Sequence, residues 1–367
     1  MARNFIEYSQ YIFDLLVGAN DVVSKTNMRV LVDEEKIDIE KQFFLGLIIK
    51  KTEQLLHDVK ICEFEYSNAR YVVFVNLSQY FNETIMDELN NYEIFPEELN
   101  TGIFLSLVKD AGVAIPKNID TNYLEEYILY QQEDPEYKGH SLEDLAKCFE
   151  PLSIFKIGIN SSFIDVTMND ICYFIYCNID SLIHLDFQGM QYQFIDMLRP
   201  ENKIPKENIF LAYTATHWKH SFLELYRCIE GLYQLPRIME LKAALNLQIS
   251  GYELVSHCFD KLGWRSKEED AFCRLIKSNM SKTVMQGCSL DSISLFADVT
   301  LDWVTDDDYD RSCKKVAKKV YKLRNSLVHH TEIENKMSLN NNEWVYLFTF
   351  LICLVKEAFQ NYSFDLP

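Results

Sequence analysis

The spacing of apolar residues divides the chain into a mixed first part and a helical second part. In the first part, one segment alternates apolar and acidic residues and two are more continuously apolar, as half-buried and buried strands are: CEFEYS (62–67), RYVVFVNL (70–77) and SIFKIGI (153–159). Two longer segments, 39–56 and 96–112, have helical spacing. We therefore predict an α+β domain over residues 1–200.

After this domain, nearly every segment has helical spacing. The predicted helices cover 209–235, 237–262, 268–280, 290–303, about 308–330 and about 342–360. The segment LRPENKIPKENI (198–209) contains two prolines and marks the boundary. Short connections between successive helices favour an antiparallel arrangement. The predicted fold is an α+β domain followed by an all-α antiparallel helical bundle over residues 201–367.

Composition agrees with two domains in a reducing compartment. The chain has 367 residues, 48% of them hydrophobic, which is enough for two cores. Its apolar run at 344–355 is too short to span a bilayer, and the start of the chain lacks the pattern of a signal peptide, so we expect a cytoplasmic protein without a membrane partner. Ten cysteines occur without a CxxC pair, which favours reduced, buried thiols. The best zinc candidate is His217-x-x-His220 with Cys228, although this spacing fits no standard zinc pattern.

The net charge of −19 is unevenly distributed. Residues 1–200 hold 15 Lys and Arg against 33 Asp and Glu, whereas residues 201–367 hold 21 against 22. Such an acidic surface repels nucleic acid, so we expect the first domain to sense or regulate, through a protein partner, a small ligand or intramolecular masking of a basic cleft. The second half is free of this excess.

Basic residues gather in RSCKKVAKKVYKLR (311–324), which carries seven cations and no acid. One interpretation is a solvated helix whose charges suit the helix dipole, since DDDYD (306–310) precedes it. The other is a positive track for a phosphate backbone. The RNA-binding candidates in this second interpretation are Lys315, Lys318, Lys319 and Lys322.

The segment YKLRNSLVHH (321–330) adds candidate chemistry to this helix. The apolar positions Val316, Val320, Leu323 and Leu327 form its predicted core-facing stripe. Asn325 and His329 are four residues apart and share a face off that stripe, whereas Arg324 lies roughly 140° around the helix from His329.

These side chains suit phosphodiester cleavage without a metal. A histidine can take a proton from a ribose 2′-hydroxyl or give one to the leaving oxygen. Arg324 can stabilise the charge that develops on the phosphorane, and Asn325 can hold the imidazole or a phosphate oxygen. A histidine after a basic helix is also what a plain C-terminal cap looks like.

The pattern Arg324-Asn325-x-x-x-His329, late in a helix of a C-terminal bundle, resembles the R-x4–6-H signature of the HEPN superfamily. LRNSLVHH between an amphipathic and an apolar helix is similar to the ApeA-like branch, and the resemblance covers about residues 208–362. It implies a homodimeric endoribonuclease without metal or cofactor that leaves 2′,3′-cyclic phosphates, as in toxins and anti-phage (abortive infection) effectors. Arg324, Asn325 and His329 carry over, with His330 as second choice for the histidine.

Many members of that superfamily add an acidic or polar residue from an earlier helix of the bundle. Glu224 and Glu230 are the candidates here, and we prefer Glu230 as the partner of Arg324. The alternative for both is an exposed charge on an amphipathic helix.

Three functions therefore remain open at this point. The leading one is an endoribonuclease that cuts single-stranded or transfer RNA. Its main rival is a catalytically inactive HEPN-like module for dimerisation or binding. A metal-dependent nuclease site in the first half is the third, but no D/E-x-K cluster follows a strand there, and neither GxGxxG nor GxxxxGK[ST] occurs.

Overall fold

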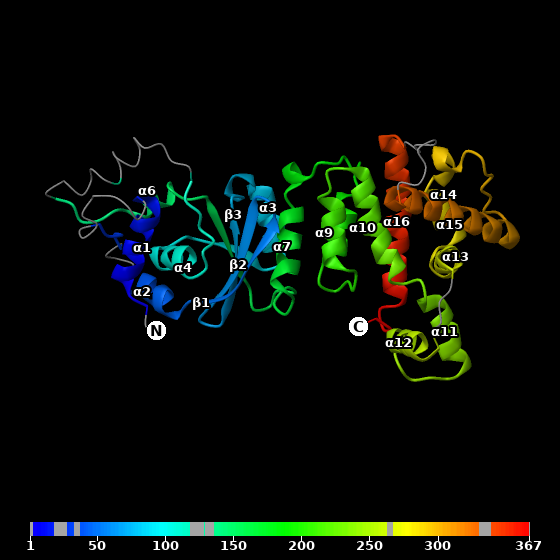
Figure 1. Ribbon diagram of the computed structural model, residues 1–367, viewed down its shortest axis with the longest axis horizontal. Helices are drawn as coiled ribbons and strands as arrows, with labels where there is room; N and C mark the ends of the chain where they lie inside the picture. Colours follow the sequence, from blue (N-terminus) through cyan, green and yellow to red (C-terminus); the bar gives the residue numbers. More distant parts are fainter. Residues whose placement is uncertain are drawn as a thin grey trace. The chain divides into compact units, whose positions relative to one another are not determined.

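The computed structural model describes residues 3–17, 28–32, 37–117, 128, 136–262, 267–329 and 339–366. It divides into two compact units, residues 1–175 and 176–367, and the division falls near the end of helix α7 (Met168–Cys177) (Figure 1). The segment 198–209, predicted as the domain boundary, instead connects two helices within the second unit.

The first unit is built on a five-stranded antiparallel sheet. Its strands are β1 (Ile48–Leu56), β2 (Val59–Tyr66), β3 (Ala69–Val75), β4 (Ile94–Glu97) and β5 (Leu152–Ile157), in the order β1-β2-β3-β5-β4. Ser67 and Asn68 join β2 to β3, and both have positive φ, as a two-residue hairpin turn with the right twist requires. The three predicted strands 62–67, 70–77 and 153–159 are thus confirmed as β2, β3 and β5.

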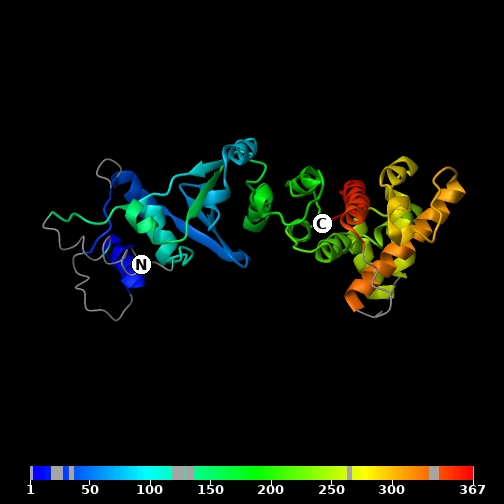
Figure 2. The same ribbon diagram turned by 90° about the horizontal axis from the view of Figure 1, so that it is seen from above.

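Helices cover both faces of this sheet (Figures 1 and 2). Figure 1 shows α2 (Ile37–Gly46) and α4 (Thr101–Lys109) on one face and α3 (Glu83–Asn90) and α7 on the other. The remaining described helices of the unit are α1 (Phe5–Val17), the 3₁₀ turn η2 (Ser78–Tyr80) and α6 (Leu142–Ala146).

Helix α4 approaches α2 closely because of one glycine. A Cβ atom on Gly102 would lie 2.3 Å from the backbone oxygen of Glu40, far inside van der Waals contact. The two helices therefore need glycine at this position. Through this contact they form one layer, and apolar residues such as Phe43 and Ile103 join the same core as Phe64 and Val73 of the sheet.

The predicted helix over 39–56 is correct only in its first half. Helix α2 ends at Gly46, and residues from Ile48 onward form β1, an edge strand paired with β2. The spacing of apolar residues in this segment suits a helix as well as a strand. The choice is made by pairing with β2, because β1 supplies the ladder hydrogen bonds that β2 would otherwise lack.

The described part of the second unit consists of helices and short helical turns. After two short elements, η5 (Asp180–Leu182) and α8 (Gln191–Met197), the α-helices are α9 (Lys206–Tyr213), α10 (Trp218–Glu230), α11 (Leu235–Ala244), α12 (Gly251–Leu262), α13 (Glu268–Asn279), α14 (Lys282–Gly287), α15 (Asp306–His329) and α16 (Asn341–Asn361). The coarse prediction of an α+β part followed by a helical part is confirmed.

Several predicted helices differ in detail. The segments 209–235 and 237–262 each form two helices, α9 with α10 and α11 with α12. Residues 290–303 contain two 3₁₀ turns, Leu290–Ser292 and Ser294–Phe296, in place of the predicted α-helix. Ser289 precedes them in a left-handed conformation, which a continuous helix does not accommodate.

Helices α10, α13, α15 and α16 pack together around aromatic side chains. Phe222 and Tyr226 of α10 lie within 6.0 Å, between ring centroids, of Trp344 on α16 and Phe272 on α13 respectively. Helix α16 starts with a capping box in which Asn340 and Glu343 bond each other's backbone N–H groups. This core fixes α15 next to α13 and α10.

Candidate active site

Helix α15 carries the predicted Arg-Asn-His motif at its last turns. Three acids, Asp306, Asp307 and Asp308, occupy its first turn, where they stabilise the positive end of the helix dipole. Of the predicted core stripe, Val316, Val320 and Leu323 are buried and Leu327 is half-buried. The apolar stripe therefore orients the helix, and its other faces carry the polar groups.

Arg324 is held at the contact between α15 and α10. Its Nη2 lies 2.8 Å from Oε1 of Glu230, and its Nη1 donates a hydrogen bond of 3.1 Å to Oδ1 of Asn325. The side chains are 22% and 30% exposed for Arg324 and Glu230. The predicted pairing of Glu230 with Arg324 is present, and the guanidinium retains access to solvent.

The other candidate glutamate, Glu224, has different partners. Its carboxylate forms an ion pair with Arg227 at 2.5 Å and accepts a hydrogen bond of 2.8 Å from the Asn208 amide. Glu224 thus joins α10 to α9, and it is not part of the Arg324 cluster.

Two tyrosines that the sequence interpretation left out belong to this cluster. The Tyr233 hydroxyl donates to the Tyr226 hydroxyl, and both rings are buried. Burial, with the nearby charge of Glu230 adding to it, raises the pKa of Tyr226, so the phenol stays neutral. Tyr226 lies four residues before Glu230 on α10, and this spacing was the available signal for it, whereas Tyr233 lies in the turn that follows the end of α10.

The histidines complete the motif only in part. His329 is the last residue of α15, one turn after Asn325 and on the same face. The side chain of His329 and all of His330 lie outside the described residues. The described geometry therefore fixes the position of the motif in the fold and the contacts of Arg324 and Asn325.

The four predicted RNA-binding lysines fall into two groups. Lys315 donates to the backbone oxygen of Thr300 at 2.7 Å, and Lys319 pairs with Asp298 at 2.5 Å. These two cations are engaged within the chain. Lys318 and Lys322 are exposed. Lys319 lowers the pKa of Asp298.

A row of exposed cations runs along α15 toward the motif. Arg311, Lys314, Lys318 and Lys322 recur every three or four residues, and all four are exposed. We call these residues the basic stripe. The same helical face continues at Asn325 and His329. Lys314 was missed among the candidates, although its spacing of four from Lys318 indicates it.

The zinc alternative has no support among the described residues, where no group of three metal-ligating side chains is found. His217 caps α10 by accepting from the Lys219 N–H at 3.1 Å, and Cys228 is buried with its sulfur near a helix carbonyl. Burial raises the pKa of Cys228 to about 12, so its thiol stays protonated.

All ten cysteines are free thiols, nine of them buried. Within the described residues, no helix is long and apolar enough to cross a membrane.

No family model, curated protein or solved structure matches this chain.

Proposed function

We propose that this protein is an endoribonuclease whose active site lies at the end of α15. The supporting observation is the anchoring of Arg324 and Asn325 one turn before His329, at the end of the basic stripe. The R-x4–6-H resemblance assigns the same three residues.

The proposed reaction forms no covalent intermediate with the protein. His329 takes the proton of a ribose 2′-hydroxyl, whose oxygen attacks the adjacent phosphorus. The bond from phosphorus to the 5′-oxygen breaks, the leaving oxygen takes a proton from water, and His329 then returns its proton to the solvent. The products are a 2′,3′-cyclic phosphate and a 5′-hydroxyl. Arg324 stabilises the charge that develops on the phosphorane oxygens.

The ion pair with Glu230 determines which N–H groups of Arg324 remain to bind a phosphate. Glu230 takes one edge of the guanidinium, which leaves other N–H groups for a phosphate, because the group carries five donors. Glu230 also reduces the conformational freedom of Arg324. In this proposal Glu230 is a positioning residue, and the dimer implied by the resemblance brings two such motifs to one RNA.

The same ion pair favours a second candidate function. Glu230 balances the charge of the Arg324 guanidinium, so a purely structural role for Arg324, tying α15 to α10, is consistent with this contact. Such a role fits a catalytically inactive HEPN-like dimerisation or binding module. That function predicts binding or self-association without cleavage.

The substrate-side test uses the purified full-length chain with EDTA present. Single-stranded and transfer RNA are compared with an oligonucleotide that carries a single 2′-deoxy sugar at the mapped cleavage position. The proposal predicts cleavage of the RNA, loss of cleavage at the deoxy position only, and 3′ ends that resist phosphatase until acid opens the cyclic phosphate. Cleavage at the deoxy position, or only with added metal, would overturn the mechanism.

A further inference from the structure

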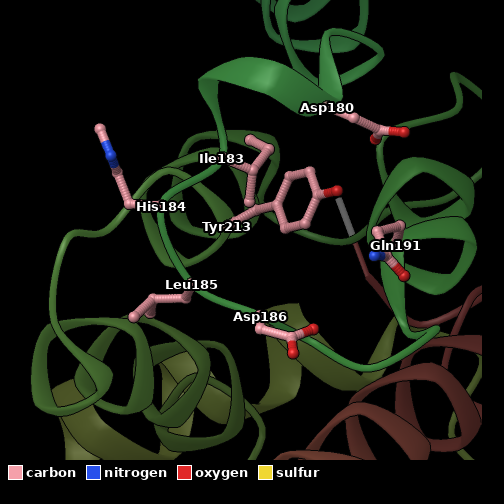
Figure 3. A pocket seen from close by; sticks show the side chains of 7 residues that line it. All are labelled: Asp180, Ile183, His184, Leu185, Asp186, Gln191 and Tyr213. Atoms are coloured by element: carbon pink, nitrogen blue, oxygen red, sulfur yellow. The ribbon is translucent and has the colours of Figure 1, made fainter.

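A pocket of about 250 Å³ lies in the second unit, on elements that do not carry the Arg-Asn-His motif (Figure 3). Its described lining residues are Asp180, Ile183, His184, Leu185, Asp186, Gln191 and Tyr213. They come from η5, the segment that follows it, the first residue of α8 and the last residue of α9. The pocket is therefore distinct from the end of α15 in its residues and elements.

Tyr213 forms a fixed polar floor for this pocket. Its ring is fully buried and packs against both Phe187 and Phe194, at centroid distances of 5.3 and 4.8 Å. These contacts leave the phenol little freedom to turn. Figure 3 shows its hydroxyl directed toward the space between Asp180 and Gln191.

The Tyr213 hydroxyl is buried without a hydrogen-bond partner. Most buried polar groups in proteins are satisfied, and an unsatisfied one destabilises the fold unless something else binds to it. Burial raises the pKa of Tyr213, so it is a neutral phenol that can accept an N–H or donate its own proton. A hydroxyl in this state points to a ligand that supplies the missing partner.

The charges of the side chains that line the pocket indicate the charge of that ligand. Asp180 and Asp186 are both exposed carboxylates, and none of the described lining residues is a lysine or an arginine. Among the described lining residues, His184 is the single basic side chain, and Figure 3 shows it pointing away from the Tyr213 hydroxyl. A negatively charged ligand is disfavoured here, and a cation is favoured.

The apolar side chains and the volume of the pocket favour a ligand with a short alkyl chain. Ile183 and Leu185 line the pocket beside the polar groups, as methylene groups require. At about 30 Å³ of liquid volume for a water-sized group, the pocket holds on the order of eight non-hydrogen atoms. Drug-sized ligands need more room.

We propose that this pocket binds a small organic cation, an alkyl amine or alkyl guanidine, with its N–H groups on Asp180, Asp186 and the Tyr213 hydroxyl. The alkyl stem packs on Ile183 and Leu185. This proposal is independent of RNA cleavage, since none of these residues belongs to the Arg-Asn-His cluster.

Agmatine and putrescine are the probes, and 1,4-butanediol is the neutral isostere of putrescine. Binding is measured by calorimetry on the full-length chain and by the thermal transition of tryptophan fluorescence. All four tryptophans lie between residues 218 and 344, so this signal reports on the second unit. We expect saturable binding of at least one cation with Kd below about 1 mM, and none of the diol.

Tyr213→Phe separates a binding role from a structural one. Removing an unsatisfied buried hydroxyl should leave the melting temperature of the free protein unchanged or higher. It should weaken cation binding severalfold. A variant with lower stability and unchanged affinity would overturn the proposed role of the hydroxyl.

Asp180→Asn with Asp186→Asn should weaken binding more than tenfold. The matched control, Glu240→Gln with Asp291→Asn, removes two exposed acids elsewhere in the unit and should bind as wild type does. Equal weakening in both variants would mean general attraction of cations to an acidic protein and would overturn the site. Absence of saturable binding to either probe would also overturn it.

Discussion

The ion pair between Glu230 and Arg324 leads to a quantitative prediction for the second unit. Its atoms are 2.8 Å apart, and its side chains are 30% and 22% exposed. Two unit charges about 4 Å apart attract by about 4 kcal/mol at an effective dielectric constant near 20. Desolvation and side-chain ordering cancel most of this, and exposed pairs retain about 0.2–1 kcal/mol.

Breaking a fully buried pair costs about 3–5 kcal/mol. The Glu230–Arg324 pair lies between these limits, so we expect a coupling energy of about 1–2 kcal/mol. The pair formed by Glu224 and Arg227 is the control, because it lies on the same helix and its arginine is 60% exposed. Its coupling energy should be about 0.5 kcal/mol or less.

Double-mutant cycles measure both values. Glu230→Gln, Arg324→Gln and their combination are compared in urea unfolding followed by tryptophan fluorescence, and the same substitutions are made at Glu224 and Arg227. A Glu230–Arg324 coupling no larger than that of the control would refute the idea that this ion pair fixes the guanidinium. In that case Arg324 would need another source of positioning.

Three further predictions concern other parts of the chain. Burial lowers the pKa of His140 below 6.5, so the folded state binds fewer protons than the unfolded chain, and stability should fall as pH drops below about 6.5. Urea unfolding followed by circular dichroism at pH about 5.5 and 7.5 should show this, and His140→Gln should remove it; an unchanged pH dependence in the variant would contradict it. Gly102→Ala should destabilise the first unit by about 3 kcal/mol in the same assay, since the new methyl group meets a backbone oxygen, and wild-type stability would argue against the close helix contact. The double variant Lys318→Gln with Lys322→Gln should reduce the slope of log affinity for single-stranded RNA against log salt concentration by about 1.4. Lys315→Gln, which changes a lysine engaged within the chain, should leave this slope unchanged. Equal slopes for the double variant and wild type would show that the basic stripe does not bind RNA.

The helical second part was predictable because its apolar spacing persists over long segments. Val316, Val320 and Leu323 recur at helical spacing and are all buried in α15. The end of α9 is decided locally, where the Thr214 hydroxyl bonds the Phe210 carbonyl and His217 then caps α10. These side-chain bonds compete with the helix and are not visible in apolar periodicity.

The first part was harder because strand pairing decides it. Residues 48–56 have a pattern compatible with a helix, and only their pairing with β2 makes them a strand. The sheet order places β5 between β3 and β4, a neighbour relation between segments far apart in the sequence. Such relations depend on tertiary contacts, which local patterns do not encode.

In the candidate site, too, some contacts could be predicted from the sequence and others could not. The Glu230–Arg324 pair was predicted only through the family resemblance, which implies an acidic residue on an earlier helix, because no local pattern links α10 to α15. The engagement of Lys319 by Asp298 could not, since Asp298 lies in an irregular segment 21 residues earlier. Tyr213 gave no signal either, because an unsatisfied hydroxyl is a property of the packed structure.

The most direct test of the proposed function is single-turnover RNA cleavage by the full-length chain in EDTA. Wild type is compared with His329→Ala and Arg324→Ala, and with the controls His257→Ala and Arg227→Ala, which change an exposed histidine and an exposed arginine elsewhere in the second unit. We predict a loss of at least about a hundredfold for each motif variant, the scale of general acid–base or electrostatic stabilisation, and wild-type rates for both controls. Equal rates in all five proteins would contradict an active site at the end of α15.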